Sequence, residues 1–173
     1  MNYANIKDCD IANGPGVRVS LFVSGCRHHC KNCFNQETWD FLFGKEFNDD
    51  VLNDLVHKLD HDYIQGFSLL GGEPFEPENQ KELVHVLKVI KACYPDKDIW
   101  CWTGWSLDKE LAPGGEKHTE YTDEMLEYID VLVDGPFVEE LKSVKLVFRG
   151  SSNQRIIDMK QTHKQHKIVT LDY

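Results

Sequence analysis

The sequence lacks any apolar run approaching the roughly 20 residues that cross a bilayer, and it has no long basic run. Its 173 residues carry a formal net charge of −10, so a basic face for nucleic acid is not indicated. The first residues, 1–8, contain no signal-peptide core. We therefore expect a cytoplasmic chain with no nucleic-acid or membrane partner, of a length suited to one domain spanning residues 1–173.

Cysteine is unevenly distributed along the chain. The chain has six cysteines, and in a cytoplasmic protein cysteines serve metal or redox chemistry more often than structural disulfides. Cysteines 26, 30 and 33 have the spacing C-x3-C-x2-C, which lets three thiolates ligate one metal centre. The scattered ones are interpreted as buried or incidental thiols: Cys9, Cys93 and Cys101.

The cysteine segment lacks a fourth ligand. A closed structural zinc site needs four ligands, and an ordinary 4Fe-4S cluster needs one cysteine per iron. Three cysteines on a four-iron cluster leave one iron free for an exogenous ligand with amino and carboxylate groups. If that ligand is a sulfonium such as S-adenosylmethionine, one electron can break a carbon–sulfur bond and release a carbon radical, while the protein supplies orientation and protection. His28 and His29, between the cysteines, are interpreted as loop residues.

Strand-like and helix-like segments alternate, which favours βα units and a parallel sheet. The predicted strands are 17–23, 67–70, 99–103 and 131–134, with weaker candidates at 145–148 and 168–171. The predicted helices begin after a cap at Asn48, at Pro77, and after a cap at Asp123. Residues 112–120 are predicted to be a surface loop or insertion. The expected fold class is α/β with parallel strands.

Each of the four main predicted strands is followed by residues suited to a ligand site. The cysteine segment follows the first strand. The other three strands are followed by Gly71-Gly72-Glu73-Pro74, Thr103-Gly104 and Asp134-Gly135-Pro136. In a parallel sheet the loops after the carboxyl ends of the strands share one edge, where ligands bind. Paired glycines let backbone approach a ligand closely, and Glu73 can accept a hydrogen bond from a ligand ammonium. We expect these four features to converge on one site.

These residues resemble the radical S-adenosylmethionine superfamily. The pattern that carries the resemblance is Cys26-x3-Cys30-x2-Cys33 followed by Gly71-Gly72-Glu73-Pro74. Further segments are similar, in order, to the activating proteins of anaerobic ribonucleoside-triphosphate reductases: 13–18, 22–26, 33–35, 38–39, 102–104, 131–137 and 149–155. Among these, 102–104 and 149–155 favour this particular family.

The resemblance implies a fold and an activity. The implied fold is a partial (β/α) barrel, open on one side. The implied activity is reductive cleavage of S-adenosylmethionine to methionine and a 5′-deoxyadenosyl radical, which removes a hydrogen from one glycine of the large reductase subunit. That glycyl radical makes the reductase competent to form deoxyribonucleotides without oxygen. The implied partners are therefore the large subunit of the reductase and a flavodoxin-type electron donor.

The resemblance also implies roles for residues of this chain. Cys26, Cys30 and Cys33 match the catalytic ligands of a 4Fe-4S cluster. A second set matches the contacts of S-adenosylmethionine: Asn32, Cys33, Phe34, Gly71, Gly72, Glu73, Thr103 and Asp134. Many superfamily members carry an aromatic residue just before the last cysteine, where this chain has Asn32. No second cysteine cluster is present, so no auxiliary iron–sulfur centre is expected.

Three other interpretations stay open. A zinc-binding module would use the three cysteines and one histidine, but it gives no reason for the segment 71–74. A simple iron–sulfur electron carrier would need a fourth cysteine, for which Cys9 is the candidate. Within the superfamily, the activator of another glycyl-radical enzyme, such as pyruvate formate-lyase, is the nearest competitor.

Overall fold

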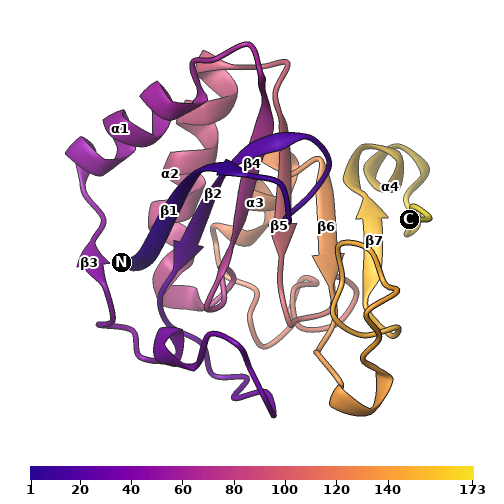
Figure 1. The fold of residues 1–173 in the computed structure, drawn as a ribbon. Coiled ribbons are helices and arrows are strands. Elements are labelled where there is room, and N and C mark those ends of the chain that lie inside the picture. The colour runs from indigo at the N-terminus through magenta and orange to yellow at the C-terminus, as the bar shows by residue number, and fades with distance from the viewer.

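The computed structural model describes residues 1–173 and contains one seven-stranded sheet in the order β3-β1-β2-β4-β5-β6-β7. Strands β2, β4, β5 and β6 run parallel, whereas β1, β3 and β7 join antiparallel at the two sides (Figure 1). The strand bounds are β1 Asn2–Asp10, β2 Val17–Val23, β3 Lys45–Glu46, β4 Ile64–Gly71, β5 Asp98–Trp102, β6 Val131–Asp134 and β7 Arg155–Asp158.

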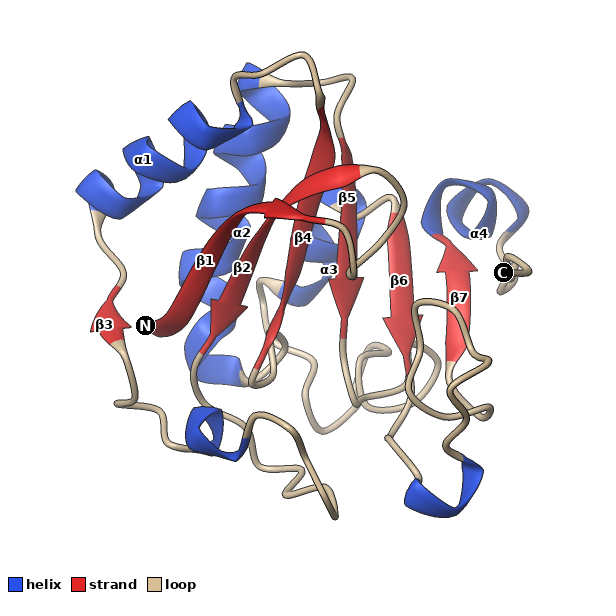
Figure 2. Cartoon of the chain, viewed as in Figure 1, coloured by secondary structure: helices blue, strands red, loops and turns tan.

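Helices cover one face of the parallel strands. Figure 2 shows α1, α2 and α3 behind the sheet and α4 beside β7. The bounds are α1 Asp49–Leu59, α2 Pro77–Cys93, α3 Thr122–Tyr128 and α4 Met159–Gln165, with short 3-10 helices at Gln36–Trp39 and Glu139–Leu141. The chain is thus a sheet with one helical layer. No helix is long and apolar enough to cross a membrane.

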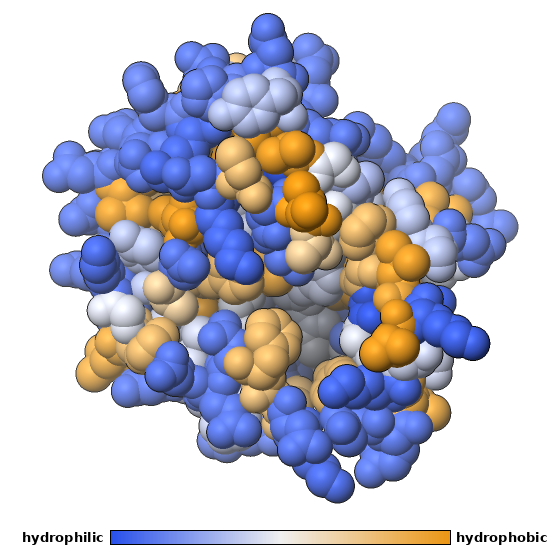
Figure 3. All heavy atoms as spheres, in the orientation of Figure 1, coloured by the Kyte–Doolittle hydropathy of each residue, from blue (hydrophilic) through white to orange (hydrophobic).

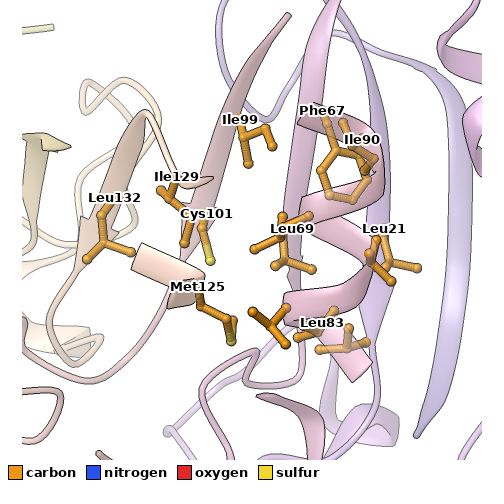
Figure 4. Packing of buried hydrophobic residues seen from close by; sticks show 14 of the residues in the cluster. Leu21, Phe67, Leu69, Leu83, Ile90, Ile99, Cys101, Met125, Ile129 and Leu132 are labelled. Carbon is orange, nitrogen blue, oxygen red and sulfur yellow. The ribbon is translucent and has the colours of Figure 1, made fainter. Parts of the chain in front are cut away.

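The apolar core lies between the sheet and the helices. Leu21, Leu69 and Cys101, from three neighbouring strands, are fully buried in one cluster with Leu83 and Ile90 of α2 (Figure 4). Burying one large apolar side chain stabilises a fold by about 1.5–3 kcal/mol relative to leaving it exposed. This packing holds the parallel strands in register and so places their carboxyl ends side by side.

Local sequence signals explain two of the helix starts and fail at a third. Helix α1 begins after Asn48, whose side-chain oxygen accepts a hydrogen bond from Val51 N at 3.0 Å, and α2 begins at Pro77, both as predicted. The predicted cap at Asp123 is wrong, because α3 begins at Thr122 and Asp123 lies in its first turn. There its carboxylate meets His118 at 3.0 Å instead of capping the helix.

The four main predicted strands are confirmed, and the two weaker ones are wrong. Residues 145–148 form the end of a turn followed by bends, and Phe148 has a left-handed φ of +58°, which interrupts a strand. In the segment 168–171 only Thr170 pairs, in an isolated bridge to Ile157. Strands β1, β3 and β7, which lie outside the parallel block, were not predicted from the sequence. Strand β1 is rich in Asn, Asp and Lys, residues that are depleted in strands.

The α/β class with parallel central strands is confirmed, with the correction that both sides of the sheet are antiparallel. The partial barrel and the single-domain assignment stay predictions, although all seven strands join one sheet. The segment 112–120 is a loop, as predicted, but it is not wholly on the surface, because Lys117 is only 7% exposed.

Candidate functional site

A cavity of about 480 Å³ opens at the carboxyl ends of the central strands. Figure 3 shows a hollow on this face of the molecule with hydrophobic atoms around its rim. Its volume falls in the range of small-molecule sites. The predicted site residues that line it are Cys26, Cys30, Asn32, Cys33, Phe34, Gly71, Gly72, Glu73 and Thr103. The structure therefore brings three of the four predicted segments together.

The cysteine loop, residues 24–35, leaves the end of β2 and is held at its base. Gly25 N donates to the carbonyl of Thr38 at 2.7 Å, and Cys26 N donates to that of Trp39 at 3.3 Å. The short helix at Gln36–Trp39 therefore supports the start of the loop, and Cys26 is buried there.

Two left-handed residues shape the rest of the cysteine loop. His29 has a φ of +50° and Asn32 a φ of +58°, a conformation that asparagine and histidine adopt more readily than most residues. Between them the chain turns back, so that Cys33 N donates to the carbonyl of Cys30 at 3.1 Å. The turn directs both cysteines to the cavity. Its left-handed backbone conformation accounts for the asparagine at position 32 even if Asn32 contacts no ligand.

All six cysteines are free thiols. Burial raises the pKa of the Cys26 thiol to about 12, and it also raises that of Cys30. Both thiols are therefore protonated at neutral pH, and metal binding must displace their protons. No three side chains of the types His, Cys, Asp and Glu are grouped closely enough to hold a single metal ion.

The candidate fourth ligands of the alternative sites are engaged or distant. Cys9 lies beside Asp10, which pairs with Arg18 at the start of β2, whereas Cys26 follows the end of this seven-residue strand, roughly 20 Å away. His28 bonds through Nε2 to Glu73 at 2.8 Å. This arrangement favours neither a fourth cysteine from β1 nor His28 as the fourth ligand of a Cys3His zinc site.

The two glycines after β4 are required by close packing. Gly71 has a φ of +119°, and a Cβ there would lie 2.4 Å from Val23 N. A Cβ on Gly72 would lie 2.6 Å from the carbonyl oxygen of Gly25. Because only glycine lacks a Cβ, only glycine lets the end of β4 lie against the base of the cysteine loop.

Glu73 is 1% exposed, and its carboxylate joins three segments. Oε1 accepts hydrogen bonds from Phe75 N at 2.9 Å and Thr103 Oγ1 at 2.7 Å. Oε2 accepts one from Gly104 N at 2.8 Å and meets His28 Nε2 at the same distance. A ligand ammonium would have to replace one of these donors to bind the carboxylate.

Asp134 lies apart from the cavity and has a different set of partners. It is fully buried, and its carboxylate accepts hydrogen bonds from Leu107 N at 2.7 Å and from Arg155 Nε at 2.8 Å. It is not among the residues that line the cavity. In the structure Asp134 joins β6 to β7 and to the loop after β5.

The cationic wall of the cavity, formed by Arg149 and Lys142, was not predicted from the sequence. Arg149 donates through Nη1 to the carbonyl of Gln154 at 2.8 Å, but its buried Nε has no hydrogen-bond partner. A buried donor without a partner is costly, so this Nε–H is suited to an anionic ligand group. The segment 149–155 was singled out only through a family resemblance, because its place depends on the unpredicted strand β7.

The residues present fit a cluster held by three thiolates together with a small aromatic ligand bearing a carboxylate. The thiols supply soft donors suited to iron–sulfur clusters. Trp102, Phe137 and Phe148 supply aromatic walls, and Arg149 supplies an unpartnered cationic donor. The cavity is therefore compatible with both groups at once.

Comparison with known proteins first defines the class. Residues 12–157 match a family described as a 4Fe-4S single cluster domain, which is a family of iron–sulfur proteins.

Individual relatives define the family more closely. The chain is 42% identical over 158 residues to the anaerobic ribonucleoside-triphosphate reductase-activating protein of Enterobacteria phage T4, covering 90% of this chain and 93% of that protein. It is 44% identical to the protein of the same name in Haemophilus influenzae, covering 90% and 97%. The Escherichia coli K12 protein is 42% identical over 156 residues, covering 89% and 96%. This chain belongs to the family of anaerobic ribonucleoside-triphosphate reductase-activating proteins.

Proposed function

We propose that this chain activates an anaerobic ribonucleoside-triphosphate reductase by radical S-adenosylmethionine chemistry. The observation that carries the proposal is the meeting of three free thiols, the glycine pair and Thr103 in one cavity. The names of the relatives support the reductase as the target. They favour this target over another glycyl-radical enzyme such as pyruvate formate-lyase.

In this proposal Cys26, Cys30 and Cys33 hold a 4Fe-4S cluster. When bound, such a cluster supplies one electron to S-adenosylmethionine, yielding methionine and a 5′-deoxyadenosyl radical that takes a hydrogen from a glycine of the reductase. The protein binds and orients the participants. Glu73 has a positioning role, because its carboxylate ties His28 of the cysteine loop to Thr103 on the neighbouring strand end.

The cavity wall accounts for binding of S-adenosylmethionine. In this proposal the backbone of Gly71 and Gly72 meets the methionine amino group, and the Arg149 guanidinium supplies a positive charge for its carboxylate. Asn32, Phe34 and Thr103 complete the contacts predicted from the family. Asp134 has only an indirect part, because it lies outside the cavity and orients the loop after β5.

The sheet forms a partial barrel in this proposal, with its open side at the cavity mouth. Phe34, which lines the mouth, is 90% exposed, and Ile11, next to lining residue Ala12, is 76% exposed. In this proposal these exposed apolar side chains contact the reductase. The glycine-bearing segment of the reductase enters there. A flavodoxin-type donor supplies the electron, and the reaction takes place in the cytoplasm.

Anaerobic reconstitution tests the proposal. The purified chain is loaded with iron and sulfide, reduced, and mixed with S-adenosylmethionine, and 5′-deoxyadenosine and methionine are assayed. We expect both products, and we expect a glycyl-radical electron paramagnetic resonance (EPR) signal when the reductase is added. A fully loaded cluster that yields neither product, with or without the reductase, would identify an electron carrier. Bound zinc without iron uptake would identify a structural metal site.

A further inference from the structure

A second buried carboxylate, Glu76, contacts the cysteine loop next to its first ligand. Glu76 immediately precedes α2 and is fully buried. Its Oε1 accepts a hydrogen bond from Arg27 N at 2.9 Å, and its Oε2 accepts one from the Arg27 guanidinium at 2.8 Å. Since Arg27 follows Cys26, the carboxylate fixes the backbone directly beside a cluster ligand.

A lysine of the loop 112–120 pairs with the carboxylate of Glu76. The sequence suggested no role for this loop. Lys117 Nζ lies 3.3 Å from Glu76 Oε2, and the lysine side chain is only 9% exposed. The same ammonium lies 4.6 Å from the centre of the Trp105 ring. Trp105 in turn packs on the ring of His28, with ring centres 3.9 Å apart. Loop 112–120 therefore reaches the cysteine loop through both the ion pair and the aromatic contact.

Charges buried beside an iron–sulfur cluster influence its reduction potential, as do hydrogen bonds and solvent exposure. A nearby negative charge disfavours adding an electron, and a nearby positive charge favours it. Glu76 and Lys117 therefore act on the cysteine loop with opposite signs.

We propose that Glu76 and Lys117 are positioning residues of the cluster: the pair holds the backbone at Arg27, and its two charges set the potential of the cluster in opposite directions. This inference rests on the proposed function, because it requires that Cys26, Cys30 and Cys33 hold a 4Fe-4S cluster. It assigns a role to loop 112–120, which delivers Lys117.

The test compares variants of the full chain after anaerobic reconstitution. Glu76→Gln is nearly the same shape but neutral, so we expect a higher midpoint potential. Lys117→Met removes the ammonium, so we expect a lower midpoint potential. Both variants should also change the EPR line shape of the reduced cluster. A purely structural role for the pair would shift both potentials in the same direction, and that result would overturn the inference.

Glu78 supplies the matched control. It also pairs with the Arg27 guanidinium, but its side chain is 51% exposed. Glu78→Gln also removes one negative charge that pairs with Arg27. We expect this variant to keep the midpoint potential and the EPR spectrum of the unmodified chain. An equal shift in Glu78→Gln and Glu76→Gln would contradict the inference, because exposure should screen the charge at position 78.

Two further measurements keep the outcomes separate. If Glu76→Gln does not fold, Lys117→Met and Lys117→Arg test the inference instead. Arginine should keep the midpoint potential of the cluster, and methionine should lower it. Equal potentials in these two variants would overturn the inference. Iron and sulfide content of the unmodified chain tests the proposed function itself. A chain without a four-iron cluster would refute the proposed function. A loaded cluster whose midpoint potential is unchanged in the Glu76 and Lys117 variants would refute only the role of the pair.

Discussion

Two buried carboxylates, one at each end of the parallel strands, collect hydrogen bonds from the segments around them. At the carboxyl ends, Glu73 takes its donors from backbone amides, Thr103 and His28. At the amino ends, Asp130 accepts hydrogen bonds from Lys91 at 2.7 Å and from Ile99 N at 2.8 Å, and it pairs with Lys160 at 2.9 Å. The first carboxylate has no lysine or arginine partner, and the second has two lysines.

This difference in partners distinguishes a carboxylate beside the candidate site from one that stabilises the fold. At the amino ends the positive charges neutralise Asp130, and the surrounding groups join α2, α4 and β5. At the carboxyl ends the donors of Glu73 leave its negative charge without a lysine or arginine partner, beside the cysteines and the cavity. A buried carboxylate without a lysine or arginine partner is costly for the fold, and such costs concentrate at functional sites. The four predictions below test this comparison.

The largest effect is expected from a cysteine at the carboxyl ends. Cys30→Ala should abolish cluster assembly and cleavage of S-adenosylmethionine, while the fold stays intact because Cys30 lies outside the apolar core. Iron content, 5′-deoxyadenosine production and far-ultraviolet circular dichroism measure the three outcomes. The control is Cys9→Ala, which lies in β1 beside the start of β2 and should retain the cluster. Product formation by Cys30→Ala would refute the ligand assignment.

The next effect compares two neighbours in β4 that face opposite sides of the sheet. Leu69 lies in the apolar core, whereas Leu70 lines the cavity. We expect Leu69→Ala to lower the free energy of unfolding by about 2–5 kcal/mol, because it leaves a hole in packed surroundings. Leu70→Ala should cost less, because its side chain already borders an open space. Urea unfolding measures both, and equal losses would show that the cavity is as tightly packed as the core.

The third effect concerns the amino ends and depends on pH. Burial alone would raise the pKa of Asp130, but hydrogen bonds from Lys91, Lys160 and Ile99 N outweigh it and lower the pKa below its usual value. The stabilisation is therefore present at neutral pH and is lost as the pH falls below about 4. Asp130→Asn should lower the free energy of unfolding by about 1–3 kcal/mol at pH 7.

Urea unfolding at pH 7 and pH 3 provides the control for this prediction. The difference between Asp130→Asn and the unmodified chain should shrink at pH 3, because the aspartate is then partly protonated in both states. A difference that stays constant between the two pH values would show that the loss comes from packing and not from charge.

The smallest effect is expected from an exposed pair of the same chemistry. Asp8 lies 3.5 Å from Lys58, and the aspartate side chain is 61% exposed. Solvent screens such a pair, so Asp8→Asn should change the free energy of unfolding by less than about 1 kcal/mol. A loss as large as that of Asp130→Asn would show that burial does not distinguish the two lysine–aspartate pairs.

Much of the parallel core could be predicted because its signals are local. The segments 17–23 and 131–134 are mostly apolar and are followed by serine or glycine, and Asn48 and Pro77 mark helix starts within a few residues. Strands β1 and β7 were missed since their residues carry weak strand patterns and are ordered mainly by pairing with a neighbour. The wall containing Arg149 was missed for the same reason, because β7 brings it to the cavity.

The sequence by itself determined the cysteine spacing, the glycine pair and the succession of the four parallel strands along the chain, and these sufficed to predict where a ligand site would form. They are sufficient because parallel strands bring their carboxyl ends to one edge. Only the tertiary structure decided how the carboxylates are used. Glu73 faces protein donors, Asp134 lies outside the cavity, and Glu76 pairs with Lys117 from a distant loop. Such partners meet through long-range packing, which local sequence patterns do not encode.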